Sequence, residues 1–231
     1  IQCFMKRILK IFKRIVLILF FGHLIYIIAL KWINPPITIT QFNSWVDGHG
    51  LRKSPISFAE MPSFIKLAVI ASEDQKFATH SGFDVEHIKK AIEFNEKNQG
   101  EKIRGGSTIS QQVAKNVFLW QKRSWLRKGL ETYFTFMIEW IWGKQRILEV
   151  YLNEAEMGIG TFGIEAASQR YFNKSAKNLT KNEAARIAVN LPNPKKYRVN
   201  PPSPYVSKRA KWVERQMRNL ESDSAIKALL E

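Results

Sequence analysis

The sequence predicts an all-α protein that carries one membrane-spanning helix near its N-terminal end. Beyond residue 60 the apolar residues recur mostly at helical spacing, and the alternating pattern of a strand is nearly absent. Near the start of the chain, sixteen consecutive residues from Ile15 to Leu30 carry no formal charge. The length of 231 residues suits one globular domain with an appendage.

The apolar run is interpreted as a transmembrane anchor. At about 1.5 Å per residue it spans roughly 24 Å, and Lys31 and Trp32 extend it to the interface. Five basic and no acidic residues precede it, whereas the next basic residue after Lys31 is Arg52. This asymmetry predicts a cytoplasmic N-terminus with the rest of the chain outside. A cleaved signal peptide is the alternative, but the run is long for one and no small-residue cleavage site follows, so we expect an uncleaved anchor.

These features divide the chain into four segments. We expect a basic cytoplasmic tail over 1–14, the anchor over 15–33, a linker and membrane-proximal segment over 34–54, and a globular domain over 55–231. Within the linker, residues 37–40 are expected to be extended if they have regular structure.

Periodicity and end signals place the helices of the domain in order. A proline in the first turn begins a helix over 62–72, and Asp84 is expected as the N-cap of the next. That second helix shows Val85, Ile88 and Ile92 on one apolar face. A mobile loop is expected over 98–106, followed by helices over 107–118, capped by Ser107, and over 125–142 and 144–153. A turn over 158–163 precedes a helix that ends near Phe172, and a Thr180–Glu183 capping box begins a helix over 180–191. An irregular stretch over 192–204 and a basic helix from about Tyr205 complete the chain.

An acidic pair ends the first of these helices. Glu73 and Asp74 follow an apolar stretch, and a carboxylate at a helix C-terminus meets the negative end of the helix dipole. Desolvation and the dipole both raise the pKa of such a carboxyl group, which suits a general base. The other interpretation is an ordinary surface pair at a helix end. We expect Asp74 to be a structural partner and His80 to support the turn that follows.

A glycine turn precedes the third helix. Free amides at a helix start bind phosphate groups, and Gly105 and Gly106 let the backbone approach such a ligand. Arg104 just before, and Lys115 and Asn116 two turns later, add hydrogen-bond donors. The alternative is a glycine hinge followed by an ordinary capped helix.

A third block places two cations beside a second carboxylate. On a helix, Arg127 and Lys128 lie at i,i+4 and i,i+3 from Glu131. The group is either a surface salt bridge of small value or a carboxylate presented with cations that hold a diphosphate. The next block, 144–153, is interpreted mainly as scaffold, with Tyr151 on its apolar face.

Composition limits the classes of partner. Lys and Arg number 36 against 20 Asp and Glu, and the net charge of +16 implies an anionic partner: nucleic acid, acidic lipid or a phosphorylated substrate. Cys3 is the single cysteine, so no internal disulfide forms, and no Cys/His cluster has zinc-binding spacing. Ser63 and Lys66 match the S-x-x-K spacing of penicillin-binding transpeptidases, but K-T-G and S-D-N are absent and the match is treated as a coincidence.

The blocks together resemble the motifs of the family 51 peptidoglycan glycosyltransferases. Residues 73–82 fit E-D-x-x-F-x-x-H-x-G, and 105–112 fit G-G-S-T-I-[ST]-Q-Q. Residues 127–131 fit R-K-x-x-E, 144–153 fit K-x-x-I-L-E-x-Y-L-N, and 190–194 resemble the family's late leucine-proline-asparagine-proline segment. With one anchor and no transpeptidase domain, the chain resembles the monofunctional members of Gram-negative inner membranes.

The resemblance implies a lysozyme-like helical fold with a cleft above a membrane-embedded lobe. It implies a single-pass protein of the bacterial inner (plasma) membrane with a periplasmic glycosyltransferase domain. The implied reaction polymerises lipid II, a disaccharide-peptide on a polyprenyl diphosphate, into β-1,4 glycan strands with inversion and release of polyprenyl diphosphate. The implied partners are lipid II, the growing glycan chain and the bilayer, with penicillin-binding transpeptidases and the division or elongation machinery, and no nucleic acid.

The resemblance also assigns residue roles. Glu73 would be the general base on the acceptor 4-hydroxyl. Glu131 would be the second catalytic residue and would orient the diphosphate, directly or through a divalent cation (Mg²⁺ or Mn²⁺). The sequence itself requires no cofactor and predicts no protein-held metal site. The other predicted site residues are the substrate-binding Arg104, Ser107, Thr108, Gln111, Gln112, Lys115, Asn116, Arg123, Arg127 and Lys128 and the supporting Asp74, Phe77 and His80.

Some features leave alternatives open. Arg186 and Asn190 stand where the family's late helix is more apolar, so this helix is expected to be less buried. Four early aromatic residues either dip into the bilayer or, the favoured interpretation, form a buried cluster. A glycan hydrolase and a membrane-tethered binder of nucleic acid or acidic lipid are the competing functions. The cation-rich blocks argue against the glycan hydrolase. The predicted location of the domain outside the cytoplasm argues against binding of DNA. The four aromatic residues are Phe42, Trp45, Phe58 and Phe64.

Overall fold

The computed structural model describes residues 2–98 and 105–231, and the chain forms two compact units, 1–34 and 35–231. The first unit is one helix, α1 (Gln2–Ala29). Its stretch Phe4–Ala29 contains an 18-residue window with a mean hydropathy of 2.1 and is long and apolar enough to cross a membrane. The predicted apolar helix is therefore confirmed, although it begins well before residue 15, because nothing in the basic stretch before it breaks a helix.

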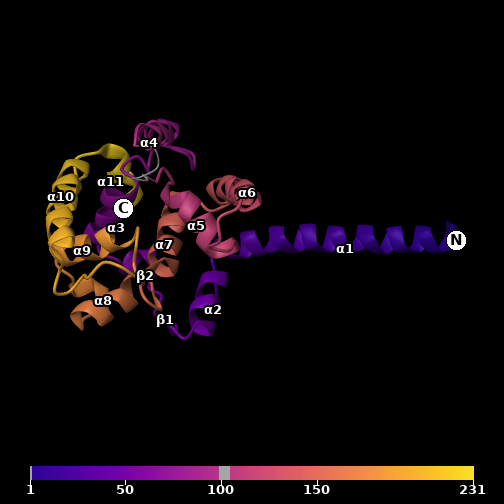
Figure 1. The fold of residues 1–231 in the computed structure, drawn as a ribbon, viewed down its shortest axis with the longest axis horizontal. Helices are drawn as coiled ribbons and strands as arrows, with labels where there is room; N and C mark the ends of the chain where they lie inside the picture. The colour runs from indigo at the N-terminus through magenta and orange to yellow at the C-terminus, as the bar shows by residue number, and fades with distance from the viewer. Residues whose placement is uncertain (1, 99–104) are drawn as a thin grey trace. The chain divides into compact units, whose positions relative to one another are not determined.

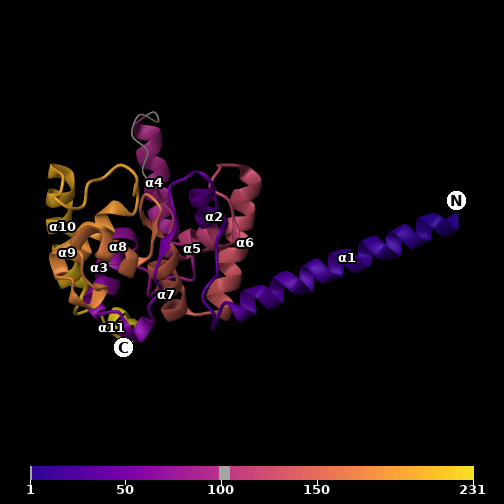
Figure 2. The ribbon, with the colours of Figure 1, turned by 90° about the horizontal axis from the view of Figure 1, so that it is seen from below.

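The second unit is mostly helical, which confirms the predicted fold class (Figures 1 and 2). Short 3₁₀ turns cover Phe58–Glu60 and Ala176–Asn178. The α-helices are α2 (Ile39–Val46), α3 (Ser63–Glu73), α4 (Val85–Lys97), α5 (Ile109–Phe118), α6 (Trp125–Ile141), α7 (Lys144–Glu154), α8 (Ile164–Phe172), α9 (Lys181–Asn190), α10 (Pro204–Leu220) and α11 (Ser224–Leu230).

The core of this unit forms around α3 and α5. Every residue of α3 from Ile65 to Ala71 is buried, and the helix packs against α9 and α10. On the other side of the unit, α5 packs against α6 and α7, as Figures 1 and 2 show. Because α3 is enclosed by its neighbours as far as Ala71, the end of the helix that carries Glu73 is held in place.

Three short strands complete the fold. β3 (Thr161–Phe162) pairs in parallel with β1 (Arg52–Lys53) and antiparallel with β2 (Glu156–Gly158). The predicted turn over 158–163 is thus the tip of a hairpin, and two- and three-residue strands are too short to give an alternating pattern. Gly160 has φ +63°, and a Cβ there would lie 2.0 Å from the His49 carbonyl oxygen.

Helix caps confirm some predictions and correct others. The predicted caps Asp84 on α4 and Thr180 on α9 both form, the latter as a capping box. The predicted cap Ser107 is wrong: Thr108 caps α5, because Gln111 three residues later returns its side chain to the Thr108 amide. The prediction for 37–40 is also wrong, since Thr38 caps α2 through the same T-x-x-Q pattern.

Burial differs from the sequence pattern in two helices, and the expectation of a less buried late helix is wrong. On α4, Val85 and Ile92 are exposed and Ala91 is the buried residue, so the predicted apolar face does not cover the core. In α9, Asn190 is fully buried because its Nδ2 donates to the Met157 carbonyl oxygen at 2.8 Å, so the late helix is buried despite this polar residue. Most of the loop predicted over 98–106 lies outside the described residues.

Candidate active site

Glu73 lies at the C-terminal end of α3, where the buried helix meets a polar turn. Its Oε2 accepts a hydrogen bond from Gln112 Nε2 at 2.9 Å, and Ser72 Oγ lies 3.5 Å from its Oε1. Burial raises the pKa of Glu73, and the hydrogen bonds from Gln112 and Ser72 only partly oppose this. The neighbouring Asp74 raises the pKa further, while Arg209 lowers it. The predicted direction of the shift is confirmed, and a carboxyl group of this kind accepts a proton readily.

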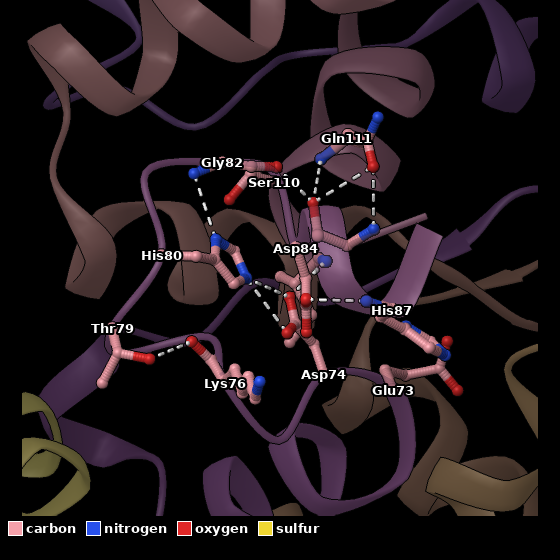
Figure 3. A network of polar contacts seen from close by, with 12 residues as sticks. Glu73, Asp74, Lys76, Thr79, His80, Gly82, Asp84, His87, Ser110 and Gln111 are labelled. Atoms are coloured by element: carbon pink, nitrogen blue, oxygen red, sulfur yellow. Dashed lines mark hydrogen bonds and ion pairs between the residues drawn. The ribbon is translucent and has the colours of Figure 1, made fainter. Parts of the chain in front are cut away.

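Asp74 points to the other side of the same turn and connects α3 to α5 (Figure 3). His80 Nε2 lies 3.0 Å from both oxygens of Asp74, and Asp74 Oδ2 accepts the Ile109 backbone N–H at 3.0 Å. His80 Nδ1 accepts the Gly82 N–H at 3.1 Å, so the proton is on Nε2 and His80 donates to Asp74. Phe77 is fully buried beneath this turn. The predicted supporting residues therefore fix the end of one helix against the start of the next.

The start of α5 is held by Thr108 and Gln111. Thr108 Oγ1 donates to the Gly82 carbonyl oxygen at 2.6 Å and accepts the Gln111 backbone N–H at 3.2 Å. Gln111 Oε1 accepts the Thr108 N–H at 3.0 Å. Thr108 is fully buried, so its role is to shape the helix start, while its neighbour Ser107 faces a cavity.

A polar cavity of about 370 Å³ lies between α5, α6 and the loop that joins them. Eight of the predicted site residues line it, together with Gln121, which sequence analysis missed. Gln121 carries no motif signal, and its Nε2 donates to Oδ1 of the predicted Asn116 at 3.2 Å. Asn116 itself does not line the cavity. Arg104 lies outside the described residues. The lining residues are Ser107, Gln111, Gln112, Lys115, Gln121, Arg123, Arg127, Lys128 and Glu131.

Glu131 is the carboxylate of this cavity and is paired with two cations. Arg127 Nη1 and Lys128 Nζ each lie 2.5 Å from one of its oxygens, and its side chain is 3% exposed. Arg127 Nε is buried without a hydrogen-bond partner within residues 2–98 and 105–231. Burial lowers the pKa of Lys115, Glu131 opposes this, and the nearby Arg127 and Lys128 lower it further. Crowded cations with an unused donor favour an anionic ligand.

Gln112 joins the acid to the cavity. Gln112 lines the cavity and its Nε2 donates to Glu73, so one hydrogen bond links Glu73 to the wall of the cavity that Glu131 also lines. The spacing of the blocks in the sequence could not show this contact, because Glu73 and Gln112 are 39 residues apart.

The residues present do not fit a protein-held divalent cation. Within the described ranges no group of three or more His, Cys, Asp or Glu side chains could hold a metal ion. Both oxygens of Glu131 already accept hydrogen bonds from cations, which would repel Mg²⁺ or Mn²⁺.

An acid at a buried helix end, hydrogen-bonded to the wall of a cation-lined cavity, suits group transfer from a phosphate-linked donor. The chain belongs to the transglycosylase family: the model for "Transglycosylase" matches residues 39–218.

Three curated relatives of this chain share one name. The chain is 48% identical over 224 residues to the biosynthetic peptidoglycan transglycosylase of Shewanella oneidensis, covering 93% of both chains. It is 48% identical over 208 residues to the protein of that name in Pseudomonas aeruginosa, covering 87% of this chain and 89% of that one. The Salmonella agona protein is 53% identical over 187 residues, covering 80% and 77%. These relatives confirm the resemblance drawn from the motifs.

Proposed function

We propose that this chain polymerises lipid II into the β-1,4-linked glycan strands of peptidoglycan. Family membership and the names of the relatives support a peptidoglycan glycosyltransferase. The observation that carries the assignment to residues is the hydrogen bond between Gln112 and Glu73, because it connects a protonatable acid to a cavity lined by basic side chains.

The reaction needs a base and an anion site, and the two ends of this site supply them. Glu73 takes the proton of the acceptor sugar 4-hydroxyl while the oxygen of that hydroxyl forms the new bond to C1 of the donor. The C1–O bond to the diphosphate breaks, and the diphosphate leaves with the electron pair. The raised pKa of Glu73 makes it a stronger base than an ordinary carboxylate.

The cavity stabilises the leaving group. Charge grows on the diphosphate as the C1–O bond breaks, and Lys115, Arg123, Arg127 and Lys128 are already assembled around that charge. Glu131 holds Arg127 and Lys128 in place through its two oxygens, so it orients the cations without touching the reacting atoms. Glu73 is thus the catalytic residue of this proposal and Glu131 a positioning residue.

The length and composition of α1 are compatible with a single-pass membrane anchor, which supports a location at the membrane. The excess of basic residues before the apolar run supports a cytoplasmic N-terminus and a periplasmic second unit. The four-segment division at residues 14, 33 and 54 and the contacts with transpeptidases and with the division or elongation machinery stay predictions.

Exposed aromatic residues of the second unit support contact with a bilayer. The buried cluster favoured for the early aromatic residues is wrong for Phe42 and Trp45, which are 49% and 61% exposed, because α2 turns them outward. On α6, Phe136 and Trp140 are 62% and 76% exposed and lie on one face.

Polymerisation of labelled lipid II by the purified full-length chain tests the proposal. Wild-type protein is expected to form glycan polymer, and Glu73→Gln is expected to form none. Glu86→Gln is a matched control, because it removes a carboxylate from the exposed surface of α4. Full activity of Glu73→Gln would remove Glu73 from the mechanism. Digestion of purified cell-wall sacculi without lipid II would instead identify a glycan hydrolase.

A further inference from the structure

Tyr151 is a buried tyrosine that the proposed reaction does not use. It lies on α7, is 1% exposed, and its hydroxyl donates to Gln112 Oε1 on α5 at 3.0 Å. The other end of the same amide, Nε2, donates to Glu73 Oε2 at 2.9 Å. Side chains from α7, α5 and α3 therefore form one chain of hydrogen bonds that ends on the catalytic acid.

The chemistry of the three groups gives this chain a direction. An ionised carboxylate can only accept hydrogen bonds, so Glu73 needs the NH₂ end of Gln112. A glutamine amide has nearly the same shape when turned over, and the turned amide would place its oxygen against the Glu73 carboxylate. A hydroxyl that faces Oε1 favours the orientation with the NH₂ group toward Glu73, because the hydroxyl can donate to the amide oxygen. Burial raises the pKa of Tyr151 well above its usual range, so this donor keeps its proton.

We propose that Tyr151 is a positioning residue that holds the Gln112 amide with its NH₂ group toward Glu73. This inference rests on the proposed function and adds a residue from the block that sequence analysis assigned to the scaffold. The other charged group near Glu73 on the same turn is Asp74, and α10 contributes Arg209 and Tyr205. The electrostatic effects of these three groups on Glu73 do not depend on the Tyr151 hydroxyl.

Replacing Tyr151 by Phe in the full-length chain tests the proposal. Without the hydroxyl, part of the Gln112 amides turn over and Glu73 loses a donor that lowers its pKa. The acidic limb of the pH–rate profile of lipid II polymerisation therefore moves to higher pH. On that limb kcat/KM falls about tenfold, and the variant approaches wild type at higher pH. Titration of the Glu73 carboxyl carbon by ¹³C NMR is expected to show the same upward shift without any substrate.

Tyr171→Phe is the matched control. Its hydroxyl donates to the Met157 carbonyl oxygen at 2.9 Å, so the change removes a comparable hydrogen bond away from Glu73. The control is expected to lower stability and to leave both titrations unchanged. An equal shift in both variants, or none in Tyr151→Phe, would show that Tyr151 only supports the fold.

A double-mutant cycle tests whether Tyr151 acts through Gln112. Gln112→Leu removes the donor directly, and Tyr151→Phe is expected to add no further shift in that background. Additive shifts would overturn the proposal. If Tyr151→Phe does not fold, the ¹³C titration of Glu73 in Gln112→Leu tests the proposal instead. An unchanged pKa of Glu73 in that variant would mean that the Gln112 amide does not control the pKa of Glu73, and would overturn the proposal. The substrate-free titration also separates this proposal from the proposed function. If the wild-type protein forms no polymer, the proposed function is refuted, whereas the titration still tests the role of Tyr151.

Discussion

The sharpest energetic prediction concerns Glu131. Glu131→Gln removes the charge that neutralises Arg127 while leaving Arg127 buried, since its side chain is 11% exposed. Removal of one member of a buried ion pair destabilises by about 3–5 kcal/mol. Lys128 is 42% exposed, so water can solvate its charge when Glu131 is replaced. The loss of stability therefore comes mainly from Arg127, and the lower end of the range of about 3–5 kcal/mol applies. We expect about 3 kcal/mol of lost stability, or a melting temperature lower by about 6–12 °C for a unit of this size.

The assay is unfolding of the full-length chain in detergent, by urea with tryptophan fluorescence and by heat with circular dichroism. Glu86→Gln is the control, because Glu86 also pairs with two lysines, Lys76 and Lys90, but its side chain is 56% exposed. Exposed pairs of this kind contribute little, although the pKa of Glu86 is lowered to about 2 by Lys76 and Lys90. Equal small losses in both variants would refute the argument that burial of Arg127 makes Glu131 necessary.

Three further predictions follow from individual side chains. Burial raises the pKa of Glu73 above 4.5, so the folded chain binds this proton more tightly than the unfolded chain and stability falls as pH rises through that interval. Glu73→Gln is therefore expected to melt at a higher temperature than wild type near neutral pH, with the difference closing in acid; the same melting temperature at every pH would contradict this. Burial lowers the pKa of Lys115 below 10.5, so the KM for lipid II is expected to rise at alkaline pH, and to rise less in Lys115→Arg, as steady-state kinetics would show. Gly160→Ala is expected to destabilise by at least about 2 kcal/mol, because its Cβ would lie 2.0 Å from the His49 carbonyl oxygen. Gly129→Ala on α6, with nothing within 4 Å, is the control and is expected to stabilise by up to about 1 kcal/mol in the same unfolding experiment.

Local signals predicted much of the helix layout. Asp84 and Thr180 were readable as caps because each side chain satisfies amides within its own first turn. The same rule would have found α2, since Thr38 and Gln41 form the T-x-x-Q pattern that also identifies Thr108 as the cap of α5. The signal for both helix starts is therefore present in the sequence.

Other features depend on contacts that sequence spacing does not contain. Val85 and Ile92 have helical periodicity, but which face of α4 meets the core is decided by neighbours far along the chain. The hydrogen bonds of Gln112 to Glu73 and to Tyr151 join three helices, each partner 39 residues away. The motifs could predict which residues matter at the site, whereas the connection between acid and cavity required the fold.

The charge balance of the cavity has a consequence for inhibitors. Four basic side chains and one carboxylate line it, so it carries a surplus of positive charge that any small polyanion can neutralise. Free pyrophosphate and short polyphosphates should compete with the lipid-linked donor there. Their competition should weaken as salt is added, because exposed charges are screened. A competitor that lacks both sugar and lipid would separate the electrostatic part of substrate affinity from the part contributed by the glycan and the membrane.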